Sequence, residues 1–278
     1  MIKEIFRLSR PVNALAGCIA VFLSAYVAGA TSWWPVFLAA FAVLLITAST
    51  NAWNDYLDID IDRVNKPHRP LPAGTITPGS ALIFSVSGSA LSLIVGAFIN
   101  QQAFLIVLLS NILLYLYSWK LKCTVLFGNI AVAAIVALCF IFGGIAAGNT
   151  EPTTMLAVTV FFALLGREIL KTMADYKGDL KEKCTTIATA WGKKVAATYV
   201  AVSLSLTALT MLLTYFIEKY NPLYLFIVIF ILFPIFIYIA STAIKYSDEK
   251  VLERSSLIMK YCFFVWFLAV ALGYGLAG

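Results

Sequence analysis

About nine long apolar runs, separated by short polar or charged links, divide this sequence. Most approach or exceed the roughly 20 residues that an α-helix needs to cross the hydrocarbon core of a bilayer, and none alternates like a barrel strand. The runs cover residues 11–30, 35–54, 79–99, 103–119, 125–148, 154–174, 195–216, 222–244 and 257–277. Because 62% of the residues are hydrophobic and 12% are charged, we expect an all-α integral membrane protein. It would be a single domain over residues 1–278, with its helices bundled around a central cavity.

The basic residues of the links predict how the helices are oriented. If the N-terminus is cytoplasmic, every Lys and Arg except Lys219 falls on or beside the cytoplasmic side, as the positive-inside rule requires. The first run lacks a convincing small-residue cleavage site, so it is interpreted as a helix and not as a signal peptide. We therefore expect a multi-pass protein of the cell membrane with its active site on the cytoplasmic side. The net charge of +6 is assigned to anchoring residues, and no nucleic acid partner is expected.

An acidic segment follows the second apolar run, in the sequence NAWNDYLDIDID at residues 51–62. On a helix, where each residue turns by about 100°, Asn54 lies at the edge of a narrow arc and Asp60 lies opposite to it. The residues of the arc are Asn51, Asp55, Asp58 and Asp62. Like charges this close raise each other's pKa unless a cation lies among them. The arc therefore predicts a cation site, although a solvated helix end is the simpler interpretation for any one aspartate.

A second acidic pair, Asp175 and Asp179, follows the sixth run and is spaced by one helical turn. It shares a helix face with Glu168 and Lys171. Carboxylate and amide oxygens suit Mg²⁺, which commonly binds one or two carboxylates together with substrate phosphates. Two such acidic faces opposed across a cavity would hold a metal–diphosphate complex.

Basic and polar residues near both acidic segments are candidates for binding phosphate groups. For each basic residue alone, a role as a positive-inside anchor is at least as well supported. The tract YLYSWKLK, at residues 115–122, adds aromatic residues typical of an interfacial belt, although Tyr117 could also donate a hydrogen bond to phosphate. The candidates are Arg7, Arg10, Asn13, Asn51, Arg63, Lys66, Arg69, Tyr117, Lys120, Lys122, Lys171 and Lys177.

The five cysteines are scattered without metal-ligand spacing, and His68 is the single histidine. We interpret the cysteines as small residues of the membrane core. One histidine cannot form an imidazole-rich metal site. The cysteines are Cys18, Cys123, Cys139, Cys184 and Cys262.

These motifs together resemble the UbiA superfamily of intramembrane prenyltransferases. The segment NDYLDIDID fits its NDxxDxxxD signature, and DYKGD fits its second motif, DxxxD. The tracts RP at 10–11, NKPHRPLPAG at 65–74 and YSWKLK at 117–122 are also similar. The resemblance extends from the first helix to the last. It implies a nine-helix fold, with Asp58, Asp62, Asp175 and Asp179 as catalytic aspartates. Mg²⁺ would bridge the substrate diphosphate through these four residues and through Asn54 and Asp55.

The resemblance also implies a reaction, in which a prenyl group moves from an allylic diphosphate to an acceptor in the membrane. The tract REILKTMADYKGD with TTIATAWG is most similar to members that join geranylgeranyl diphosphate to geranylgeranylglyceryl phosphate, in the biosynthesis of archaeal ether phospholipids. Aromatic acids, quinone precursors and chlorins stay open as alternative acceptors. A cation-coupled transporter is the non-enzymatic alternative, but it would place carboxylates near the bilayer midplane and not at helix ends.

Overall fold

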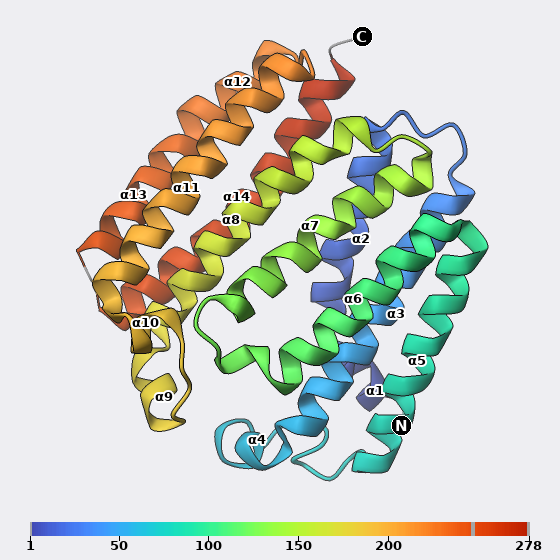
Figure 1. The fold of residues 1–278 in the computed structure, drawn as a ribbon, viewed down its shortest axis with the longest axis vertical. Helices are drawn as coiled ribbons and strands as arrows, with labels where there is room; N and C mark the ends of the chain where they lie inside the picture. Colours follow the sequence, from blue (N-terminus) through green and yellow to red (C-terminus); the bar gives the residue numbers. More distant parts are fainter. Residues whose placement is uncertain (1, 246–247, 277–278) are drawn as a thin grey trace. The chain divides into compact units, whose positions relative to one another are not determined.

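The computed structural model describes residues 2–245 and 248–276, and the side chains of Ile2, Val12, Asn13 and Asn65 lie outside this description. All regular structure in the described ranges is helical (Figure 1). The long helices are α2 (Pro11–Val27), α3 (Trp34–Leu57), α5 (Pro78–Ile99), α6 (Gln101–Trp119), α7 (Phe127–Ala147), α8 (Glu151–Ala174), α11 (Gly192–Ile217) and α14 (Glu249–Gly275). One further long segment joins α12 (Pro222–Ile227), the π-helix η2 (Val228–Leu232) and α13 (Phe233–Ile244).

Eight of the described helical segments, counting Pro222–Ile244 as one, are long and apolar enough to cross a membrane. The helix α2 adds a shorter apolar segment. The prediction of an all-helical membrane protein is therefore confirmed. The last helix starts earlier than its apolar run suggested, because the Asp248 carboxylate accepts a hydrogen bond from the Glu249 amide and caps α14 there.

Short helices lie in the polar links. They are α1 (Ile2–Leu8), α4 (Ile59–Asn65), the 3₁₀ turn η1 (Leu121–Cys123), α9 (Tyr176–Lys181) and α10 (Ile187–Ala190). Composition indicates where such links are, but these helices are too short to show a clear apolar period. They carry six of the residues predicted to form a site, which are Arg7, Asp62, Arg63, Lys122, Lys177 and Asp179.

The chain forms two compact units, which we describe separately. The first comprises residues 1–121 and 138–153, and the second comprises residues 122–137 and 154–278. In the first unit α3 packs along α5 and α2, while α6 packs against both α3 and α5 (Figure 1). Its core is built largely from alanine and valine, including Ala25, Ala39 and Val107. Small side chains let membrane helices approach closely, and dispersion contacts then stabilise the packing.

Polar side chains inside the helices of the second unit mostly find partners within the same helix. In α11 the hydroxyl of Thr207 donates to the Ser203 carbonyl at 2.8 Å, Thr210 donates to Thr207 at 3.0 Å, and Thr214 donates to Thr210 at 2.8 Å. A buried chain also links three helices, because Trp266 Nε1 donates to the Tyr224 hydroxyl, which donates to the Met211 carbonyl. Such pairing avoids the cost of an unsatisfied polar group in an apolar environment.

Candidate functional site

The first acidic segment is not one continuous helix. The helix α3 ends at Leu57, and α4 begins at Ile59, with Asp58 between them at φ −90° and ψ 9°. The backbone hydrogen bonds continue across this break, since Asp58 N donates to Asn54 O at 3.0 Å and Asp62 N donates to Asp58 O at 2.8 Å. The arc calculated for a regular helix therefore needs correction at Asp58, where the backbone departs from helical geometry.

Two carboxylates of this segment, Asp55 and Asp62, share one guanidinium group. Arg69 Nη1 lies 3.1 Å from Asp55 Oδ1 and also donates to Asp62 Oδ2. Both carboxylates are almost fully buried, whereas the Arg69 side chain is 20% exposed. Arg10 donates to the same oxygen of Asp55 from the other side. Because a buried charge requires a partner, the negative charge of Asp55 is stabilised by these two arginines.

Backbone contacts fix the segments that carry the arginines. Arg10 has φ 48°, a left-handed conformation, at the junction of α1 and α2. The Asn51 side-chain amide donates to the Ser9 carbonyl at 3.1 Å, so α3 also holds the residue before Arg10. Arg7 donates to the His68 carbonyl at 2.9 Å, just before Arg69. The N-terminal turn, the end of α3 and the loop after α4 thus form one network.

The other residues of the segment have different partners. Asn54 donates from its side chain to Asp58 Oδ2 at 2.9 Å, and both are partly exposed. Lys66 lies 3.9 Å from Asp62. Asp60 and Arg63 are strongly exposed and pair with each other at 2.9 Å. Arg63 was a candidate phosphate ligand, and in the structure its guanidinium contacts this exposed carboxylate.

The second acidic segment lies in the second unit, between α8 and α10. Asp175 separates α8 from α9, and Asp179 N donates to Asp175 O at 2.9 Å. Burial raises the pKa of the Asp179 carboxyl to about 6, and negative Asp175 adds to the rise. A hydrogen bond from Thr186 and the positive charge of Lys122 act in the opposite direction. Asp179 is thus a half-buried carboxylate whose pKa is raised chiefly by burial.

A charged cluster precedes this segment on α8. Glu168, which is 8% exposed, pairs with Arg167 at 2.8 Å and with Lys171 at 3.0 Å. Arg167 also donates to the Ser256 carbonyl of α14 at 3.3 Å. Lys171, a candidate phosphate ligand, is therefore held by Glu168.

The remaining candidates are placed as follows. Tyr117 is half-buried in α6. Lys120 is exposed, with its ammonium 4.2 Å from the centre of the Trp119 ring. Lys122 is exposed in η1, and Lys177 pairs with Glu249 at 3.2 Å. Asn13 lies in α2, and its side chain is outside the described part of the chain.

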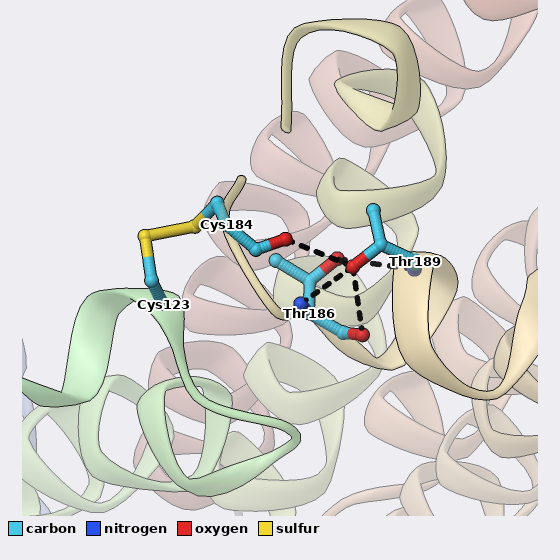
Figure 2. The surroundings of a disulfide bond; sticks show 4 residues. All are labelled: Cys123, Cys184, Thr186 and Thr189. Atoms are coloured by element: carbon cyan, nitrogen blue, oxygen red, sulfur yellow. Dashed lines mark hydrogen bonds between the residues drawn. A yellow bond between two sulfur atoms is a disulfide. The ribbon is translucent and has the colours of Figure 1, made fainter. Parts of the chain in front are cut away.

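The interpretation of all five cysteines as membrane-core residues is wrong for two of them. Cys123 and Cys184 form a disulfide within the second unit (Figure 2). They are 61 residues apart, so their spacing gave no indication of the pairing. Thr186 and Arg167 were also missed as possible site residues. The threonine-rich tract after Cys184 was a usable signal for Thr186, because such residues commonly cap helices and bind nearby acids.

The donor chemistry of the acidic segments suits Mg²⁺, since it consists of carboxylate and amide oxygens. Among the described residues, no group of three or more His, Cys, Asp or Glu side chains converges as a metal cage. Mg²⁺ rarely uses such a cage, because it keeps several waters and binds one or two carboxylates together with substrate phosphates. Paired donors such as Asn54 with Asp58 therefore fit this mode of binding.

Comparison with known proteins shows the family. The profile of the UbiA prenyltransferase family matches residues 14–272, and the chain belongs to this family. Digeranylgeranylglyceryl phosphate synthase from Methanothermobacter thermautotrophicus is 32% identical over 96% of this chain and 94% of that protein. The synthase of the same name from Methanosphaera stadtmanae is 34% identical over 95% of this chain and 96% of its own length.

Solved structures show the same fold. One structure, from work on digeranylgeranylglyceryl phosphate synthase in membranes, has a TM-score of 0.86 and 29% identity, and covers 98% of both chains. A UbiA homolog from Archaeoglobus fulgidus, bound to GPP and Mg²⁺, has a TM-score of 0.75 and covers 99% of both chains at 22% identity. The expected family and its multi-pass membrane fold are therefore confirmed.

Proposed function

We propose that this protein transfers a geranylgeranyl group from geranylgeranyl diphosphate to the free hydroxyl of geranylgeranylglyceryl phosphate. The hydroxyl oxygen bonds to C1 of the donor, the C1–O bond to diphosphate breaks, and diphosphate and a proton are released. The product would be a doubly prenylated precursor of archaeal ether phospholipids. The observation that carries this assignment is the similarity to synthases of this reaction, at 32% and 34% identity over nearly the whole chain.

The first unit would bind an anionic group through its arginines. Arg69 touches two carboxylates, so it can exchange one of them for a phosphate oxygen while the other keeps it in place. Arg10 is held by Asp55 and is 31% exposed, so part of its guanidinium is accessible. Guanidinium groups bind phosphate oxygens in a planar, often bidentate geometry. We assign Asp55 to positioning these arginines, in place of the metal-binding role considered from the sequence.

Asn54, Asp58 and Asp62 would hold Mg²⁺ in the first unit, and Asp175 and Asp179 would do so in the second. The metal would supply positive charge that stabilises the departing diphosphate. Asn54 orients Asp58 through its side-chain hydrogen bond, and Thr186 does the same for Asp179. The proposal that both segments serve one donor rests on the sequence resemblance.

The membrane environment would also protect the allylic cation and surround the prenyl chains. An allylic cation that develops during transfer reacts readily with water, so an apolar environment protects it. The long apolar helices of both units provide such surroundings for the prenyl chains. A phosphate-bearing lipid acceptor would need further cations, and Lys120 in the first unit and Lys171 in the second are each at least partly exposed.

The test is product analysis with the full-length protein in detergent or nanodiscs. The protein is mixed with geranylgeranyl diphosphate, Mg²⁺ and geranylgeranylglyceryl phosphate, and lipids are identified by mass spectrometry. We expect the doubly prenylated glyceryl phosphate, and we expect its formation to stop when Mg²⁺ is chelated. Parallel reactions contain 4-hydroxybenzoate or the acceptor without its phosphate. Transfer to 4-hydroxybenzoate alone would contradict the proposed acceptor, and ion flux into proteoliposomes without any prenyl transfer would support a transporter.

A further inference from the structure

The disulfide between Cys123 and Cys184 joins two polar links of the second unit. Cys123 is the last residue of η1, and Cys184 lies between α9 and α10 (Figure 2). Cys123 directly follows Lys122, while Cys184 comes five residues after Asp179. The covalent bond therefore connects a basic link to the second acidic segment.

The Cys184 side of the bond is well fixed. Cys184 N donates to the Asp179 carbonyl at 2.8 Å, and Thr189 Oγ1 donates to the Cys184 carbonyl at 2.9 Å. Thr186 and Thr189 form a reciprocal capping box at the start of α10, as Figure 2 shows. Cys184 is thus held between Asp179 and a capped helix, so it restrains the position of Cys123, which is bonded to its sulfur.

The Cys123 side of the bond brings a cationic residue, Lys122, toward Cys184. Lys122 belongs to the three-residue turn η1, and its side chain is exposed. Lys122 directly precedes Cys123, whose sulfur is bonded to that of Cys184, and Cys184 N donates to Asp179 O at 2.8 Å. The Lys122 main chain is tied to the Asp179 segment by the adjacent disulfide.

The bond is also accessible to reduction. Cys123 is exposed, whereas Cys184 is 8% exposed. A thiolate attacks a disulfide at a sulfur atom that it can reach, and Cys123 is the more exposed residue of this pair. The basic links predict a cytoplasmic location, where the disulfides of mesophiles are usually transient, catalytic or redox-sensing, whereas intracellular proteins of hyperthermophilic archaea are rich in disulfides.

We propose that the Cys123–Cys184 disulfide is a redox-responsive tie that positions Lys122 beside Asp179 and thereby sets the affinity for the diphosphate substrate. This inference rests on the proposed prenyltransferase function. Reduction by a dithiol breaks the S–S bond, adds two electrons and two protons to give two cysteine thiols, and converts the dithiol to its own disulfide. Lys122 is then held by its backbone and local contacts alone, so it spends less time at the diphosphate.

The experiment uses full-length protein purified without reductant, with free thiols alkylated at lysis. Peptide mass spectrometry first measures the fraction of protein that contains the Cys123–Cys184 bond. Initial rates of geranylgeranyl transfer are then measured against donor concentration, before and after treatment with dithiothreitol. We expect reduction to raise the donor KM about tenfold, the effect of losing one charge-assisted contact, while kcat changes less than twofold. Reoxidation should restore the original KM.

Variants distinguish a role of the disulfide in positioning Lys122 from a general effect on the stability of the protein. Cys123→Ser and Cys184→Ser should both have the high KM without any response to dithiothreitol. Cys262→Ser removes a free, buried cysteine of the same unit and should keep the redox response. Lys122→Met should raise the donor KM in the oxidised protein, and reduction should then add little. A merely structural disulfide would not make the effect of reduction depend on Lys122.

Three results would overturn the inference. They are cysteines 123 and 184 recovered as alkylated thiols, a donor KM that is the same in the oxidised and reduced forms, and an undiminished redox response in Lys122→Met. Calorimetric titration with inorganic diphosphate and Mg²⁺ gives a readout that does not require transfer. If no acceptor is prenylated but diphosphate affinity still falls about tenfold on reduction, the proposed function fails and the redox-responsive tie stands.

Discussion

Arg10 and Asp55 form an ion pair that connects the turn before α2 to the last turn of α3, 45 residues further along the chain. Asp55 is nearly buried, and Arg10 adopts a left-handed backbone conformation. A non-glycine residue in that conformation is strained and persists where its surroundings hold it. The ion pair and the contact from Asn51 to Ser9 provide that support. The acidic segment therefore has a structural task in addition to any role in binding substrate.

Asp55→Asn should destabilise the protein. The substitution removes the negative charge that Arg10 and Arg69 share, so Arg10 loses its carboxylate partner and Arg69 keeps only Asp62. Because both arginines are partly exposed, we expect a loss of about 1 to 3 kcal/mol. The measurement is the temperature at which the protein in detergent loses its monodisperse elution peak. Asp60→Asn, which alters an exposed pair, is the matched control and should elute like the wild type. An unchanged transition temperature for Asp55→Asn would contradict this account.

Arg69→Lys should impair catalysis even though it preserves the charge. A lysine ammonium is a point charge, whereas the guanidinium reaches Asp55 and Asp62 together. We expect kcat/KM for geranylgeranyl diphosphate to fall by about 10- to 100-fold, which corresponds to one or two lost contacts to charged groups. Arg63→Lys, on the exposed side, should retain the wild-type value. Equal losses in both variants would argue for a general effect of positive charge.

Neutralising one aspartate in either acidic segment should raise the Mg²⁺ concentration that transfer requires. In Asp58→Asn and Asp175→Asn we expect the Mg²⁺ concentration for half-maximal transfer to rise at least about tenfold, because an anionic oxygen ligand becomes neutral. Titration of initial rates with Mg²⁺ at saturating donor measures this. Asp60→Asn again serves as the control. A normal Mg²⁺ dependence in Asp175→Asn would remove the second segment from the proposed metal-binding residues.

Gly143→Ala should disturb packing in the first unit. A Cβ atom at this position would lie 2.0 Å from Ser24 Oγ and 2.4 Å from the Val21 carbonyl oxygen, so α2 and α7 would have to separate. Overpacking of this kind costs about 1 to 3 kcal/mol. The yield of monodisperse protein and its transition temperature in detergent should both fall. Gly79→Ala, where no atom lies within 4 Å of the added carbon, should behave as wild type. Similar behaviour of the two variants would refute the close approach of α2 and α7.

The sequence predicts the positions of the helices well. It predicts only some of the contacts between the site residues. Apolar length places α3 and α8 to within a few residues, because the bilayer sets the length of a spanning helix. The helical period brought Asp55 and Asp62 to one side, and in the structure they share Arg69. The helical period could not reveal the break at Asp58. Backbone hydrogen bonds continue through this break, so the segment keeps its helical spacing on both sides.

Contacts between distant segments were beyond such reasoning. Nothing in the spacing of Cys123 and Cys184 distinguishes them from the three cysteines outside the disulfide, because their pairing depends on how two links approach each other. The pairing of Arg10 with Asp55 likewise depends on the path of the chain between α1 and α2. The sequence could identify these residues as charged or reactive, but it could not supply their partners.

The hydroxyl groups of α11 have a consequence for how the protein is made. Thr207, Thr210 and Thr214 each donate to a carbonyl of their own helix, so their polar groups need no neighbour. A helix of this kind can leave the translocon and enter lipid before its partners are synthesised, because it exposes few unsatisfied donors to the acyl chains. We therefore expect α11 to insert before it assembles with other helices, and substitutions that spare its internal hydrogen bonds should affect assembly and not insertion.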